Sequence, residues 1–314
     1  MITRRRFIQK VKEISYKTFF SFTLFPLFLK YAKAADDKSS FDMIALQGGK
    51  GPDELFKKGI EFLGGMKKFV KKGQKVLVKP NIGWDRSPEY GANTSPELIG
   101  VIVKECLNAG AAEVYVFDHT CDSWQNCYKN SKIEEYAKNN GGNVVAANSQ
   151  EYYVKKSIPR AKVLKEALVH KLFVECDVVI NVPVLKHHGS ASVTGSMKNL
   201  MGVVWDRREW HSKDLHQCIA DFATFRKTDL TVLDGWRVMV KNGPRGYSPS
   251  DAVKYEYLFI STDPVAIDSA GVSVLARENS SIKKPEDIRY IKLAREYGLG
   301  KTDLDKMNIK RITI

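Results

Sequence analysis

The sequence predicts an α/β fold with a mostly parallel sheet and helices on both faces. From about Phe41 onward, short apolar runs alternate with amphipathic stretches, the pattern of strands alternating with helices. Several runs are continuously apolar, which is typical of parallel strands buried on both faces. The 314 residues, 43% hydrophobic and 27% charged, have a globular composition that excludes disordered, collagen-like and disulfide-scaffold proteins.

The elements follow in chain order. The apolar runs predict strands at residues 43–47, 75–79, 113–117, 143–147, 178–182, 230–233 and 257–261. The amphipathic segments predict helices at residues 53–62, 96–108, 131–139, 165–174, 213–225, 264–276 and 285–297. Ser95 and Asp263 each precede a proline and are predicted to be helix N-caps. Residues 236–254, with several Gly and Pro, are the longest irregular stretch and are predicted to form a lid or small subdomain.

Residues 1–34 have the layout of an export signal of the twin-arginine type. A basic stretch containing Arg4-Arg5 precedes an apolar run at 18–29 and a small-x-small cleavage site at 32–34. As a helix this run spans about 18 Å, short of the roughly 30 Å hydrocarbon core, so no stable membrane span is expected after cleavage. An uncleaved signal acting as an anchor is the alternative. We therefore expect the twin-arginine export machinery as a partner, a periplasmic or extracytoplasmic location, and a single α/β domain at 35–314.

Charge and cysteine usage narrow the function classes. Half of the formal net charge of +14 lies in residues 1–34, and no basic-aromatic motif is present, so no nucleic-acid partner is expected. Without any C-x-x-C, the five cysteines lack ferredoxin-type iron–sulfur spacing. Cys121 and Cys127, close together in a polar loop, are predicted to form a disulfide, with two free thiols as the alternative.

Parallel sheets bind ligands at the carboxyl ends of their strands, and polar residues follow several predicted strands. Lys79 and Asn81 flank Pro80 at one such end, where an ammonium beside a carboxamide suits an anionic group. Alternatively, Lys79 pairs with a neighbouring acid and Asn81 makes a turn. At the next strand end Asp118 precedes His119, which is a candidate metal ligand or general base.

The densest group of polar residues follows the predicted strand at 178–182. His187 and His188 are candidate metal ligands or proton carriers, and Asp234, after another apolar strand, is placed like an acid or a metal ligand. Lys186 and Lys198 supply positive charge, and a desolvated Lys198 would be an amine nucleophile. The candidate residues for binding a cofactor are Lys79, Asn81, Lys186, Thr194 and Asn199. The alternative is a solvated polar loop.

Four motifs in one order resemble the domain-of-unknown-function family 362. They are Lys79-Pro80-Asn81, the run from Lys186-His187 to Lys198-Asn199-Leu200-Met201-Gly202, Asp234-Gly235 with Asn242-Gly243-Pro244, and Asp263-Pro264-Val265-Ala266-Ile267-Asp268. The resemblance implies an α/β domain with no settled reaction. More remotely, the chain is similar to the amino-terminal half of nickel-pincer lactate racemases. That similarity implies roles in catalysis or in holding the cofactor for His119, His187 or His188, Lys198 and His211.

These observations predict a cofactor- or metal-dependent enzyme that acts on an anionic small molecule. The expected catalytic residues are His119, His187 and Lys198, and the expected metal ligands are His187, His188 and Asp234. A divalent transition metal or a metal-organic group would be the cofactor. The alternative is a non-catalytic module that binds or delivers a small molecule or cofactor at the same residues.

Overall fold

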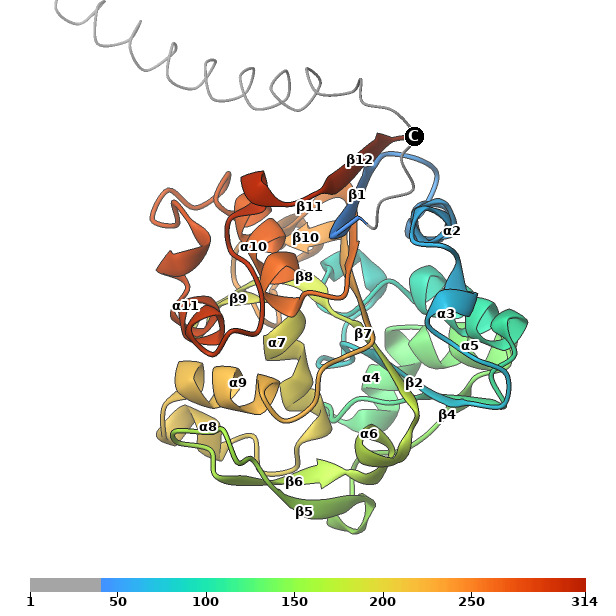
Figure 1. Ribbon diagram of the computed structural model, residues 1–314, viewed down its shortest axis with the longest axis horizontal. Helices are drawn as coiled ribbons and strands as arrows, with labels where there is room; N and C mark the ends of the chain where they lie inside the picture. Colours follow the sequence, from blue (N-terminus) through green and yellow to red (C-terminus); the bar gives the residue numbers. More distant parts are fainter. Residues whose placement is uncertain (1–40) are drawn as a thin grey trace, which may run out of the picture. The chain divides into compact units, whose positions relative to one another are not determined.

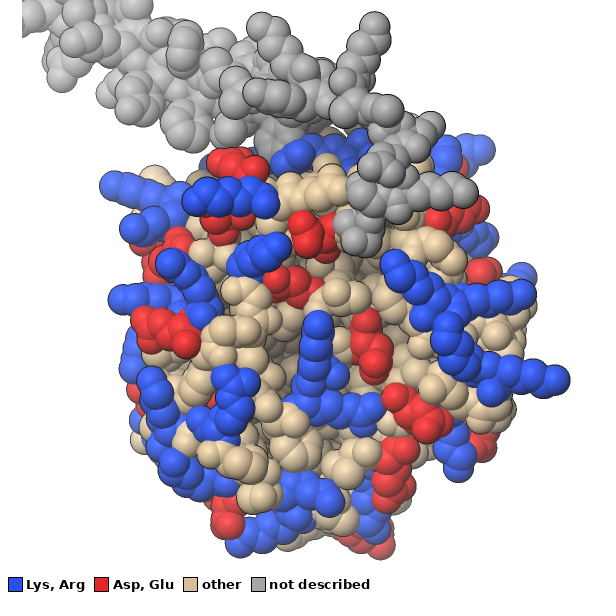
Figure 2. All heavy atoms as spheres, viewed as in Figure 1, with Lys and Arg blue, Asp and Glu red and all other residues tan. Residues whose placement is uncertain are grey.

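The computed structural model describes residues 41–314, which form one compact unit. The predicted export signal at residues 1–34, with its Arg4-Arg5 pair, lies outside the described residues. Among residues 41–314, no helix combines the length and the apolar character needed to span a bilayer. On the face drawn in Figure 2, acidic side chains lie among the basic ones, so this face is not uniformly basic.

A ten-stranded, mostly parallel sheet forms the centre of the described chain (Figure 1). Eight of its strands lie in the order β12-β1-β11-β10-β7-β2-β3-β4. Their bounds are β1 Met43–Gln47, β2 Lys75–Pro80, β3 Glu113–Val116, β4 Asn143–Val144, β7 Val178–Val182, β10 Leu230–Met239, β11 Ala252–Ser261 and β12 Ile309–Thr313. Only β11 runs antiparallel to its neighbours in this order, because a hairpin connects it to β10. The predicted fold class is confirmed.

Helices cover both faces of the sheet (Figure 1). One set contains α2 (Pro52–Phe62), α3 (Pro96–Ala109), α4 (Trp124–Asn130) and α5 (Ile133–Asn139), and the other contains α7 (Ser196–Asn199), α9 (Leu215–Ala223), α10 (Pro264–Leu275) and α11 (Arg289–Glu296). Side chains alternate between the faces of a strand, so Val76 and Val78 pack with the first set and Leu77 packs with the second. The continuous apolar runs therefore fill two separate cores.

Shorter elements complete the fold. They are β5 (Tyr153–Ser157), β6 (Glu166–His170), α6 (Lys171–Glu175), β8 (Val184–His188), β9 (Ser192–Thr194) and α8 (Glu209–Ser212), together with the 3-10 helices η1 (Met66–Lys68), η2 (Pro88–Tyr90), η3 (Gln150–Tyr152), η4 (Leu200–Val203), η5 (Pro249–Asp251), η6 (Pro285–Asp287) and η7 (Leu304–Lys306). The helix predicted at 165–174 is wrong: β6 pairs with β5, and only the last residues are helical. Pairing with the preceding strand outweighed the local periodicity.

The stretch predicted to be irregular, residues 236–254, is mostly a hairpin. Strands β10 and β11 pair from Thr231 to Met239, and a loop at 240–251 joins them. Asp251 closes this loop by accepting the backbone N–H groups of Tyr247, at 2.7 Å, and Ser248, at 3.1 Å. The loop packs on the β8–β9 turn, where Gly189 N–H donates to Gly243 O at 3.2 Å. It is therefore tied to the sheet edge that carries the predicted site.

Candidate functional site

The carboxyl ends of β3, β2, β7 and β10 meet at one edge of the sheet, as parallel neighbours must. Lys79 is the last residue of β2 before Pro80 ends it, Asp118 follows β3, Asn181 lies in β7, and Asp234 lies in β10. These four polar residues are buried. A buried polar group is costly unless it is bonded, so the partners of each one decide what it can do.

Lys79 forms a buried ion pair with Asp118. Its Nζ lies 2.8 Å from Asp118 Oδ1 and also donates to Asn199 Oδ1 at 3.1 Å. Burial lowers the pKa of Lys79 and the Asp118 carboxylate opposes that shift. A side chain on Gly202 would overlap the Asp118 carboxylate and approach Lys79 Nζ to 2.6 Å, so only glycine fits there. The Lys79 ammonium is thus already paired with an acid, as the alternative reading anticipated.

Asparagine amides extend this ion pair into a network. Asn199 Oδ1 accepts from Asn81 Nδ2 at 2.8 Å, and Asn199 Nδ2 donates to Asn181 Oδ1 at 2.8 Å. Asn81 Oδ1 in turn accepts from Lys186 Nζ at 3.0 Å. Lys79, Asn81, Lys186 and Asn199, which the sequence placed near one another, are therefore joined by hydrogen bonds. Asn181 was missed, although a lone polar residue inside the run Val178–Val182 was its signal.

Strand β8 separates the two adjacent histidines. Alternation on an extended strand puts Lys186 and His188 on one face, and both are buried. His187 lies on the opposite face, where its Nδ1 accepts the Gly243 N–H at 3.2 Å. Burial lowers the pKa of His188 to about 2 and that of Lys186 to about 7, with Lys198 adding repulsion in both cases. The chain thus brings His188, but not His187, toward the lysines.

Thr194 lies on β9 directly opposite Lys186. It is buried, and its hydroxyl has no hydrogen-bond partner within residues 41–314. The predicted binding residue Thr194 therefore has a hydroxyl that can still donate and accept a hydrogen bond, opposite Lys186 on β8.

Lys198 lies on the short helix α7, which α10 holds in place. The Asp268 carboxylate on α10 accepts the backbone N–H groups of Ser196 and, at 3.2 Å, Met197. Burial raises the pKa of Asp268 to about 7. Lys198 itself is only partly buried and has no hydrogen bond or ion pair within the described residues. Burial, followed by repulsion from Arg207, lowers its pKa to about 8.

Arg207 clamps the loop that follows β3. Its guanidinium donates to the backbone oxygens of His119 and, at 2.6 Å, Thr120, and lies 3.4 Å from Cys121 Sγ. Sequence reasoning did not single out Arg207, because it lies in a polar stretch after the recognised motif. His119 Nδ1 lies 3.1 Å from Val204 O, and its ring stacks on Trp205 with centroids 5.0 Å apart. The pKa of His119 is lowered, first by burial and then by Arg207.

The three predicted metal ligands do not converge. Asp234 uses its carboxylate to accept the backbone N–H groups of Ser95 at 2.7 Å and Trp236 at 3.0 Å, while β8 directs His187 and His188 apart. In the described part of the chain, no group of three or more His, Cys, Asp or Glu side chains is arranged to hold a metal ion.

All five cysteines are free thiols, so the expected Cys121–Cys127 disulfide is not formed. Cys127 is buried in α4, whereas Cys121 is exposed beside Arg207. The buried position of Cys127 agrees with the alternative of two free thiols.

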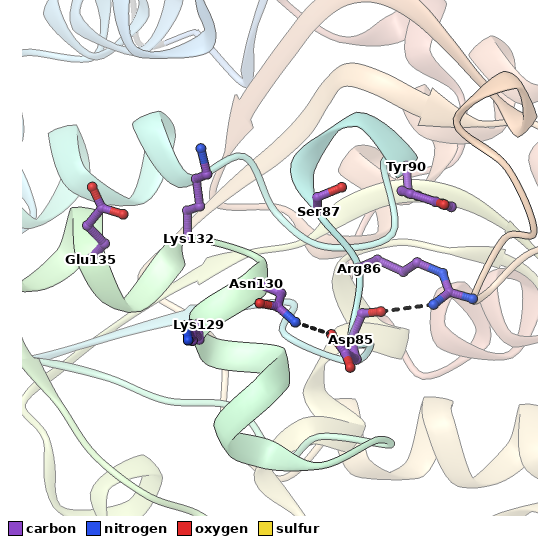
Figure 3. A pocket seen from close by; sticks show the side chains of 8 residues that line it. All are labelled: Asp85, Arg86, Ser87, Tyr90, Lys129, Asn130, Lys132 and Glu135. Carbon is purple, nitrogen blue, oxygen red and sulfur yellow. Dashed lines mark hydrogen bonds between the residues drawn. The ribbon is translucent and has the colours of Figure 1, made fainter.

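Two cavities lie away from this network. The first, of about 550 Å³, is lined by charged side chains of the loop after β2 and of α4 and α5, including Arg86, Lys129 and Glu135. Figure 3 shows Asn130 bonded to Asp85 in this cavity. The second, of about 240 Å³, lies between β6 and α8 and has Trp210 in its wall. Neither is lined by a predicted site residue.

Comparison with known proteins identifies related chains. The family model described as Domain of unknown function (DUF362) matches residues 76–273. The thylakoid-associated protein sll1697 of Synechocystis sp. is 27% identical over 235 residues, which cover 70% of this chain and 71% of that protein. The family predicted from the four motifs is thereby confirmed.

Two solved structures are also similar. A protein from Thermotoga maritima is 12% identical with a TM-score of 0.43, covering 80% of this chain and 60% of that one. The lactate racemase apoprotein from Thermoanaerobacterium thermosaccharolyticum is 14% identical with a TM-score of 0.44, covering 74% and 57%. This chain spans less than two thirds of the length of either solved protein.

Proposed function

The chain belongs to the DUF362 family, and from that premise we propose that it is an exported enzyme that binds an anionic small molecule at the carboxyl edge of its sheet. The main observation behind this proposal is an excess of positive charge at this edge of the sheet. The cations Lys79, Lys186, Lys198 and Arg207 interact electrostatically with one another and with a single carboxylate, Asp118. Because Lys79 already occupies that carboxylate, an anionic ligand would relieve the remaining repulsion.

The cationic side chains have two different roles in this proposal. Lys79, Asn81, Lys186 and Asn199 are bonded to one another and form a rigid frame. Lys198 and Arg207 are only partly buried and can reach a ligand. The frame positions helix α7, which carries Lys198, and Lys198 and Arg207 bind the anion.

His119 is suited to carry a proton at this site. The Val204 carbonyl next to Nδ1 favours the tautomer with hydrogen on Nδ1, which leaves Nε2 as a proton acceptor. The lowered pKa keeps the imidazole neutral near pH 7. His187, which bonds the hairpin loop instead, acts as a positioning residue.

A metal held by His187, His188 and Asp234 does not fit the described geometry, since Asp234 is engaged with two backbone amides. The binding of a metal-organic cofactor through Thr194 and Asn199 stays a proposal, supported by the unpartnered Thr194 hydroxyl.

Thermal unfolding with a panel of anions tests the binding step. Phosphate, acetate, pyruvate and succinate are added to the wild type, to Lys198→Ala and to Lys292→Ala, an exposed lysine outside the cluster. A ligand at 100 times its Kd stabilises the protein by about 2.7 kcal/mol. We expect at least one anion to stabilise the wild type and Lys292→Ala but not Lys198→Ala. Equal stabilisation of all three proteins would contradict the proposal.

The same anions, incubated with the protein and then recovered, distinguish an enzyme from a non-catalytic module that binds or delivers a small molecule. The closed hydrogen bonding of Lys79, Asn81 and Lys186 favours the second candidate, because a fully bonded frame is a good binding scaffold without being reactive. Stabilisation by an anion that is recovered chemically unchanged after long incubation would favour the module. Conversion of the anion, abolished in Lys198→Ala, would favour the enzyme.

Export is proposed from the signal layout of residues 1–34 together with the similarity to the thylakoid-associated protein sll1697. Fractionation of cells that express the full chain tests it. We expect the protein in the extracytoplasmic fraction, and retention in the cytoplasm when Arg4 and Arg5 are both changed to Lys. Unchanged export of that variant would remove the twin-arginine route.

A further inference from the structure

Lys198 differs from the other lysines of the strand edge in having nothing bonded to its amine. Lys79 Nζ has an acid and two oxygens as neighbours, and Lys186 Nζ has two oxygens. Lys198 is partly exposed, and within residues 41–314 its Nζ has no hydrogen bond or ion pair. The helix that carries it is fixed by the buried Asp268. The amine is therefore held by its backbone while its nitrogen is free to react.

The surroundings of Lys198 favour the unprotonated amine. Burial and the positive charges of Arg207 and Lys79 lower its pKa, while Cys121 and Asp118 oppose that shift. With a pKa of about 8, about half of the amine is free at pH 8, against about 0.3% for a lysine with an ordinary pKa. A lysine that is desolvated next to another cation is a recognised nucleophile toward carbonyl groups.

We propose that Lys198 forms a Schiff base with a small anionic carbonyl compound of the 2-oxo acid class. This inference rests on the proposed anion-binding function and names its substrate class. Nζ bonds to the carbonyl carbon while the carbon–oxygen double bond opens to give a carbinolamine. The oxygen then leaves with both amine protons as water, and a carbon–nitrogen double bond remains. No oxidant or reductant is needed.

Arg207 is the residue that selects an anion in this proposal. Its described contacts, to His119 O, Thr120 O and Cys121 Sγ, use three of its five N–H donors. The remaining donors can bind a carboxylate that lies next to the reacting carbonyl. A neutral ketone or aldehyde lacks this contact, so the site should prefer the charged compound.

Reductive trapping tests the inference on the full chain. The protein is incubated with pyruvate and sodium cyanoborohydride at pH 8, digested, and each lysine's adduct is quantified by mass spectrometry. We expect Lys198 to be labelled at least tenfold faster than Lys292. Arg207→Gln removes a charge that lowers the Lys198 pKa, so it should slow labelling with both compounds, but it should slow labelling with pyruvate severalfold more than labelling with acetone. Labelling of Lys198 no faster than that of Lys292 would overturn the inference.

A conservative variant distinguishes this inference from the proposed function. Lys198→Arg keeps the positive charge but cannot form a Schiff base, so anions should still raise its Tm while the adduct disappears. If pyruvate raises the Tm of the wild type and no adduct forms on Lys198, the Schiff base is wrong and anion binding stands. If pyruvate and the other anions leave the Tm unchanged and no adduct forms, both proposals fail. Circular dichroism of each variant verifies that it is folded.

Discussion

Lys79 and Lys198 lie in the same cluster at the carboxyl edge of the sheet, yet the fold treats them in opposite ways. Lys79 is fully buried and bonded to Asp118 and Asn199. Lys198 is partly exposed, with no bonded partner in the described chain. A buried charge persists only when it is paired, so Lys79 has a structural role. An unpaired amine held in place by its backbone is instead available for chemistry. Charge and position along the chain alone do not distinguish these two cases.

Loss of Lys79 should have the largest effect on stability. Lys79→Met leaves the Asp118 carboxylate buried without its counter-charge, and breaking such a pair costs about 3–5 kcal/mol. Urea denaturation measures this loss. The double variant Lys79→Met/Asp118→Asn should recover part of it, because no buried charge is left over. A Lys79→Met protein within 1 kcal/mol of the wild type would mean that the ion pair does not support the frame.

Asn199 should come next, because its amide joins Lys79, Asn81 and Asn181. Asn199→Ala removes the partner of Asn81 Nδ2 and of Asn181 Oδ1 and one bond of Lys79 Nζ, and we expect a loss of about 2–3 kcal/mol in the free energy of unfolding. Asn108→Ala, on the exposed end of α3, is the matched control and should change stability by less than about 0.5 kcal/mol. Equal effects of the two changes would show that the network contributes nothing to stability.

The anchor of Lys198 predicts a dependence on pH. The folded-state pKa of Asp268 is raised from 3.8 to about 7, so between these values the folded state binds more protons than the unfolded state. The Asp268 contribution to stability is therefore full below about pH 4 and is lost as the pH rises toward 7. Asp268→Asn cannot titrate, so its stability relative to the wild type should rise by up to about 1.4 kcal/mol per pH unit in this range. Parallel curves for the two proteins would refute this assignment.

Lys198 should show the smallest effect on stability. Its side chain lacks a bonded partner, so Lys198→Ala should change the free energy of unfolding by less than about 0.5 kcal/mol in the absence of ligand. Urea denaturation of the ligand-free protein measures this. A loss comparable to that of Lys79→Met would place Lys198 in the structural frame and remove the contrast between the two lysines.

The sequence predicted the strand ends because continuous apolar runs mark buried parallel strands. It also predicted that Lys79, Asn81, Lys186 and Asn199 gather, since the carboxyl ends of such strands lie at one edge. Their partners could not be predicted. Asp118 was singled out only as the residue before His119, yet it pairs with Lys79, and that pairing depends on the spacing between two strands.

Other errors came from segments whose structure depends on distant partners. No strand was predicted at residues 184–188, yet they form β8. Because side chains alternate between the two faces of a strand, a strand predicted here would have placed His187 and His188 on opposite faces. Arg207 was not singled out because its partners lie about ninety residues away in the loop after β3.

The clamp formed by Arg207 has a mechanical consequence. One guanidinium fastens the segment after η4 to the loop after β3 through two backbone oxygens and Cys121 Sγ, so two of the three contacts do not depend on which side chains the loop carries. Substitution of Thr120 or Cys121 would therefore leave the two bonds from Arg207 to the backbone of this loop in place. An anion that draws the Arg207 guanidinium toward itself would weaken the attachment between these two segments, while the hydrogen bonds among Asn81, Asn181 and Asn199 stay formed.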